Sequence, residues 1–205
     1  DRNLPVTAMT DLLPNWIEGL GTGEQQLMIG VLILSTLLVL AYFLRIPLRS
    51  WKEKRQIRRA VKRLGARVMR DASLPDGMGG KINIDFLVLT VDAILVIGVK
   101  RYDGMIFGSA NTDEWTQTLN SRSYRFPNPD VYLAQQLSAV QSIITRVPVK
   151  GLHLFTDTAT FPWDKPDNVL QVNDLLSKKI TRPEPKDIPA DLGKAWLQLS
   201  KSIQQ

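Results

Sequence analysis

The chain of 205 residues contains no cysteine, which excludes disulfides, thiolate metal sites and cysteine nucleophiles. Its hydrophobic content of 44% is enough for one compact domain and an additional segment. The net charge of +6 is distributed unevenly, because residues 1–44 carry −3, residues 45–70 carry +10 and residues 71–205 carry −1. The excess positive charge is therefore confined to one short block.

An acidic N-terminal segment and an uncharged run precede the basic block. In residues 11–20 the apolar side chains, with Trp16 among them, fall on one side of a helix. This pattern predicts a short helix in an extracytoplasmic segment, residues 1–25, that lies on a membrane surface or docks on a partner membrane protein. The run LMIGVLILSTLLVLAYFL at 27–44 would form a helix about 27 Å long, close to the roughly 30 Å of bilayer hydrocarbon. It predicts a single transmembrane helix over residues 26–48, with a buried core helix as the alternative.

The basic block indicates how that helix would be oriented. Because cationic residues concentrate on the cytoplasmic side of membrane spans, the C-terminal domain is expected in the cytoplasm and the N-terminus outside a bacterial-type inner membrane. The same side chains are expected to contact anionic lipid headgroups, and nucleic-acid phosphates are the alternative partner. The residues concerned are Arg45, Arg49, Lys52, Lys54 and Arg55.

A helix over residues 49–66 and a larger domain follow the predicted span. An apolar stripe that includes Ile57 and Val61 predicts that this basic helix packs one face onto the domain. Residues 67–180 read as α/β, with a mixed central sheet and flanking helices, and a Pro-rich linker and C-terminal helix occupy residues 181–205. Strands are predicted at 67–75, 81–90, 93–100, 104–108, 114–119 and 149–156, and helices at 127–147 and 188–203.

Several motifs in this domain occur in a characteristic order. NIDFLV contains Asp85, VIGVK ends at Lys100, DG and FG lie between Asp103 and Gly108, and Trp115 and FPNP with Gln135 follow. From about residue 61 to residue 176 this order resembles the nuclease-related domain family, which is similar to the PD-(D/E)xK nucleases. The resemblance implies a restriction-endonuclease-like fold. It also implies a site in which Asp85 and a Glu-x-Lys on the next strand bind Mg²⁺ or Mn²⁺ and activate water, with Gln135 contributing from the helix.

The sequence departs from that pattern where the second carboxylate is expected. Residues i and i+2 of a strand share a face, so the missing acid would stand at Gly98, beside Lys100. Asp71, on the preceding strand, and Asp103, on the following turn, are the acids that could substitute for it. With Asp85 alone the metal site is expected to be degenerate, with Asp85 and Lys100 left as an ion pair and no cofactor bound.

These observations lead to two functional hypotheses. The first is an accessory or scaffold subunit of a membrane protein assembly, in which Asp85, Lys100 and Gln135 are vestigial. The alternative is a membrane-tethered metal-dependent nuclease that acts on DNA or RNA. The one histidine of the chain, His153, is interpreted as a packed strand residue because its neighbours are apolar.

Overall fold

The computed structural model describes residues 22–75, 79–163 and 165–203, so the segment around Trp16 lies outside the described residues. The first element, α1, is a continuous helix from Thr22 to Leu64. It confirms the helical prediction for both the uncharged run and the basic block. The chain divides into two compact units, residues 1–52 and 53–205.

The uncharged part of α1 exposes its described side chains. From Leu27 to Tyr42 each residue is exposed, with Leu34 at 58% and Leu38 at 63% of full exposure. Among the residues that the structure describes, no helix combines the length and apolarity needed to cross a membrane. The predicted transmembrane helix is therefore not confirmed. Arg45 and Arg49 lie outside the described side chains.

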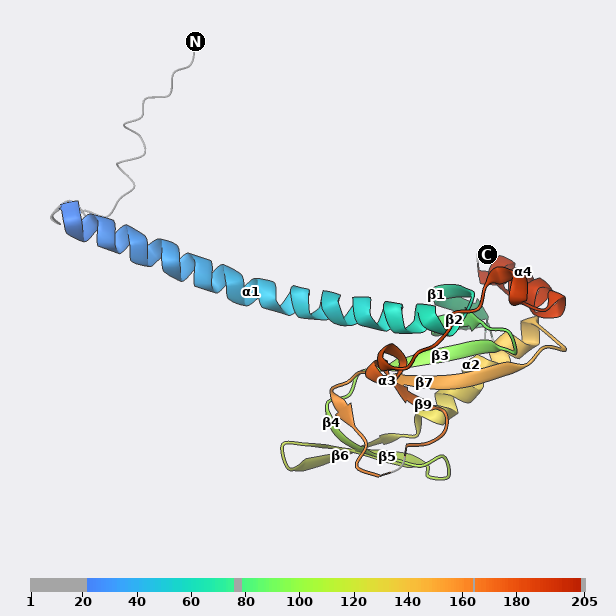
Figure 1. Cartoon of the computed structure of the whole chain (residues 1–205). Helices are drawn as coiled ribbons and strands as arrows, with labels where there is room; N and C mark the ends of the chain where they lie inside the picture. The colour runs from blue at the N-terminus through green and yellow to red at the C-terminus, as the bar shows by residue number, and fades with distance from the viewer. Residues whose placement is uncertain (1–21, 76–78, 164, 204–205) are drawn as a thin grey trace, which may run out of the picture. The chain divides into compact units, whose positions relative to one another are not determined.

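The second unit is built on a five-stranded mixed sheet, in the order β1-β2-β3-β7-β9. The first three strands are antiparallel, whereas β3, β7 and β9 run parallel (Figure 1). The predicted strands and the predicted mixed sheet are thus confirmed, while the short β9 was not predicted. The bounds are β1 Arg67–Pro75, β2 Lys81–Leu89, β3 Ile94–Lys100, β7 Val149–Phe155 and β9 Val169–Gln171.

A second sheet, which the sequence did not predict as a separate layer, is formed by three strands that follow β3 and by one short strand that follows β7. Its order is β6-β5-β4-β8, and Trp115 and Phe155 are fully buried in the apolar cluster beside it. The strand β6 was not predicted from the sequence. Most of its side chains are exposed, and RSYRFP therefore shows no alternation of apolar and polar residues. The bounds are β4 Gly104–Phe107, β5 Glu114–Leu119, β6 Arg122–Pro127 and β8 Ala159–Thr160.

Helices cover both faces of the five-stranded sheet. We call the side covered by α2 (Pro129–Ile143) and α4 (Ala190–Ile203) the α2 face. The other side, covered by the end of α1 and by α3 (Val172–Ser177), is called the α1 face. Ile57 and Val61 are buried on the α1 face, which confirms that the basic helix packs onto the domain. A short 3₁₀ turn, η2 (Pro185–Asp187), precedes α4.

Candidate functional site

Lys100 and Gln135 lie together, on the side of the sheet that α2 covers. Both line a cavity of about 280 Å³ with Tyr102, Tyr132 and the first residues of α2. The Lys100 Nζ atom lies 5.9 Å from the centroid of the Tyr132 ring. We call this the Lys100 cavity. It contains two of the three residues that the resemblance assigned to catalysis.

Asp85 lines a different cavity. This cavity, of about 160 Å³, lies beside the end of α1 and contains Asp71 as a second carboxylate. The Asp85 Oδ2 atom accepts a hydrogen bond from the Val99 backbone N–H at 2.7 Å. We call this the Asp85 cavity. Asp71, named from the sequence only as a substitute, is therefore the acid that the fold brings to Asp85.

A local change of face in β1 and β2 explains why Asp85 is separated from Lys100. Ile84 packs on the α2 face and Phe86 on the α1 face, although residues two apart in a regular strand share a face. The pairing of β1 with β2 omits Asp71 and Asp85, and Asp71 has φ of 51°. The pairing is thus interrupted at these two opposed aspartates without a shift of register, and both line the cavity on the α1 face.

Position 98, in contrast, faces α2. A Cβ added to Gly98 would lie 3.9 Å from Gln136 Oε1 and 3.8 Å from the His153 ring nitrogen Nδ1. A carboxylate at this position would therefore point away from the Asp85 cavity. The residues do not fit the metal site that the resemblance implied, both because position 98 is glycine and because Asp85 and Lys100 line different cavities.

The predicted ion pair between Asp85 and Lys100 is wrong. Within the described chain, Lys100 makes no ion pair with any carboxylate. Burial lowers the pKa of Lys100 below its ordinary value, and the charges of Asp85 and Asp130 oppose this shift. The interaction with Asp85 is thus a field effect without direct contact.

Cations surround the two aspartates of the Asp85 cavity. Four basic residues line it, and of these only Arg101 has an ion pair among the described residues, with Glu53 of α1 at 2.9 Å. Over the described ranges no group of three or more histidine, aspartate or glutamate side chains is arranged to hold a metal ion. The cavity therefore combines two carboxylates with an excess of positive charge. Its basic residues are Lys54, Arg58, Arg70 and Arg101.

His153 is buried in β7, as the sequence predicted, but it belongs to a polar cluster. Its Nε2 atom lies 2.8 Å from Asp130 Oδ1, which also accepts a hydrogen bond from Asn168 at 2.6 Å. Asp130 is held in the first turn of α2, where its backbone N–H donates to the Asn128 side chain at 2.9 Å. Sequence reasoning missed this cluster because its members come from a strand, a helix and a turn that are far apart in the sequence.

Acid should destabilise the domain through His153. Burial lowers the pKa of His153 below its ordinary 6.5, and the hydrogen bond to Asp130 opposes this effect. The unfolded chain therefore binds a proton at a higher pH than the folded chain does, so stability falls as the pH drops below about 6.5. The slope cannot exceed one proton, about 1.4 kcal/mol per pH unit. Urea unfolding between pH 7.5 and 5 measures it.

A matched variant isolates this contribution. In His153→Gln the stability change between pH 7.5 and 5 should be smaller than in the wild type, since no other histidine is present. An equal pH dependence in both proteins would contradict the assignment.

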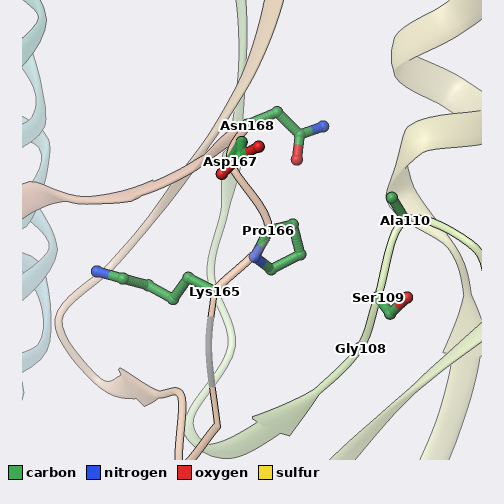
Figure 2. A pocket seen from close by; sticks show the side chains of 7 residues that line it. All are labelled: Gly108, Ser109, Ala110, Lys165, Pro166, Asp167 and Asn168. Atoms are coloured by element: carbon green, nitrogen blue, oxygen red, sulfur yellow. The ribbon is translucent and has the colours of Figure 1, made fainter.

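A further cavity, of about 390 Å³, lies between the end of β4 and the loop at 165–168 (Figure 2). Figure 2 shows the Lys165 side chain pointing away from the Gly108–Ala110 segment, and its amine is bound to Asp174 at 2.5 Å. The amide of Asn168 donates to Asp130. Both of these side chains are therefore already engaged in contacts within the domain.

Comparison with known proteins identifies the family. The family model described as nuclease-related domain matches residues 49–156, which is more than half of the chain. The chain belongs to the nuclease-related domain family. An uncharacterized protein of Bacillus anthracis is 22% identical over 160 residues, covering 73% of this chain and 76% of the relative. No solved structure gives a significant match.

Proposed function

We propose that this nuclease-related domain protein is a membrane-anchored accessory or scaffold subunit whose nuclease site is not functional. The proposal is carried by the observation that Asp85 and Lys100 line two different cavities. In addition, position 98 of β3, which faces α2, is a glycine. A PD-(D/E)xK site needs these side chains to converge on one metal ion and one phosphate.

Membrane anchoring is supported by the exposed part of α1. Sixteen consecutive described residues, from Leu27 to Tyr42, are exposed and uncharged, and the sequence continues with Phe43 and Leu44 before the first arginine. So large an exposed apolar surface requires a bilayer or a protein partner to cover it. We propose insertion into the inner membrane with the N-terminus outside, because the following block carries +10. Of the basic residues whose side chains the structure describes, Lys52, Lys54 and Arg55 would then contact anionic headgroups.

Other membrane protein subunits are the proposed partners. A domain that lacks a catalytic site but keeps an ordered fold and an anchor is suited to hold a complex together. The segment around Trp16 and the exposed face of α1 are the parts of the chain proposed to contact them.

A cleavage assay tests the catalytic part of the proposal. The full-length protein, incubated with single- and double-stranded DNA or RNA in Mg²⁺ or Mn²⁺, should show no metal-dependent hydrolysis. Gly98→Glu should not restore it, because a side chain at 98 faces α2 and not the Asp85 cavity. A known metal-dependent nuclease serves as the positive control. Cleavage by Gly98→Glu alone would show that only the ligand, and not the geometry, was lost.

A working nuclease remains the second candidate, and one observation favours it. Asp71 joins Asp85 in a cavity with four cations, and Mg²⁺ can be held by one or two carboxylates together with substrate phosphates. This alternative predicts cleavage by the wild type that is lost in Asp85→Asn and in Asp71→Asn but kept in Lys100→Met. The proposed subunit role would then have to be abandoned.

A further inference from the structure

On the α2 face, Gly98 leaves room for a methyl-sized group at ordinary contact distances, and we call this space the void above Gly98. His153 is 1% exposed and Gln136 is 3% exposed, and both direct a polar atom toward the place where a side chain of residue 98 would begin. The His153 Nδ1 atom has no hydrogen-bond partner among the described residues, unlike the other buried side-chain nitrogens and oxygens there. An unpaired Nδ1 atom at such a site is unusual, because buried polar groups are almost always hydrogen-bonded.

The protonation of the His153 ring follows from its other nitrogen. The Nε2 atom faces a carboxylate oxygen, which can only accept, so Nε2 carries the hydrogen. Burial lowers the pKa of the ring and so keeps it neutral. The Nδ1 atom therefore presents a lone pair and needs a donor.

Gln136 presents a second acceptor to the same place. Its amide Nε2 atom donates to the Asn83 carbonyl at 2.6 Å, which orients the side chain so that Oε1 faces Gly98. The Lys100 side chain passes on another side, with its Cε atom 3.9 Å from the point that a Cβ of residue 98 would occupy. The void is thus bounded by two hydrogen-bond acceptors and by the aliphatic part of the Lys100 side chain, whose amine is a donor.

We propose that one water molecule is bound above Gly98, donating to His153 Nδ1 and Gln136 Oε1 and accepting a hydrogen bond from Lys100. Water has two donors and two acceptor sites, which match this set of partners. An anion is disfavoured because two acceptors line the void. A divalent cation is disfavoured because the described residues offer it only one imidazole and one amide as ligands, and the charge of Lys100 lies nearby.

The proposal gives Lys100 a structural role. The water stands where the family pattern has a carboxylate, and it would link Lys100 to His153 and, through His153, to Asp130. The hydrogen bond to this water would then fix the position of the Lys100 side chain within the Lys100 cavity. This inference does not depend on membrane anchoring or on the subunit role.

Nitrogen NMR of the full-length protein in detergent tests this site directly. Labelling histidine with ¹⁵N reports on His153 alone, because it is the one histidine in the chain. In the wild type, Nδ1 should resonate as an unprotonated nitrogen that accepts a hydrogen bond. In Gly98→Ala, whose methyl group fits at ordinary contact distances but cannot donate, Nδ1 should move to the position of a free lone pair.

Two further variants keep the test decisive. Gly98→Ser supplies a hydroxyl in place of the water and should return Nδ1 toward the wild-type position. Gly193→Ala, at a glycine with nothing within 4 Å of an added Cβ, should leave the His153 signals unchanged. A free lone pair in the wild type, a proton on Nδ1, or selective broadening of the signal by Mn²⁺ would each overturn the water assignment.

Discussion

Arginines placed in the exposed apolar part of α1 should release the protein from membranes. We expect the double variant Leu34→Arg, Leu38→Arg to be lost from the membrane fraction of cells, whereas the wild type stays there after a carbonate wash. The two positions are four residues apart on one side of the helix and are 58% and 63% exposed. Each exchange costs about 3 kcal/mol at the centre of a span, so the pair changes partitioning by roughly ten-thousand-fold.

The control places the same charges on apolar side chains elsewhere. Trp163 and Leu197 are 74% and 53% exposed and lie outside the uncharged run. The double variant Trp163→Arg, Leu197→Arg should therefore remain in the membrane fraction. If the wild type is found in the supernatant, or if both double variants behave alike, anchoring by α1 is wrong.

Gly108→Ala should destabilise the domain by about 3 kcal/mol, at the upper end of the cost of overpacking a core. A Cβ at this position would overlap the indole of Trp115. The indole has little freedom to move, since Trp115 is fully buried, its Nε1 donates to the Ser109 carbonyl at 3.0 Å, and its ring stacks on Phe155. This close approach explains why position 108 is glycine.

Thermal unfolding followed by circular dichroism measures the effect. For a chain of this size 3 kcal/mol corresponds to a melting temperature lower by about 6–12 °C. Gly193→Ala, in α4 with open space around the added methyl group, should be as stable as the wild type or more stable by up to about 1 kcal/mol. Equal melting temperatures for Gly108→Ala and the wild type would show that Trp115 can shift.

The sequence by itself determined most of the helices and strands of the second unit. It also showed that the acid expected at position 98 is missing. Apolar periodicity and the proline at the start of α2 predicted α1, α2, α4 and the longer strands of the five-stranded sheet, because these patterns depend on neighbours within one element. The family motifs and the glycine at position 98 could be recognised directly from the identity of the residues at those positions. The weakly apolar β6 and the short β8 and β9 could not be found in this way.

Only the tertiary structure decided which side chains meet. Strand alternation would have placed Asp85 with Lys100, but the strands change face where their pairing is interrupted at Asp71 and Asp85, and no local periodicity signals that change. Likewise, His153 meets Asp130 across 23 residues of sequence, through the packing of α2 on β7. Such contacts arise from how elements pack against one another, and the order of residues within each element does not contain that information.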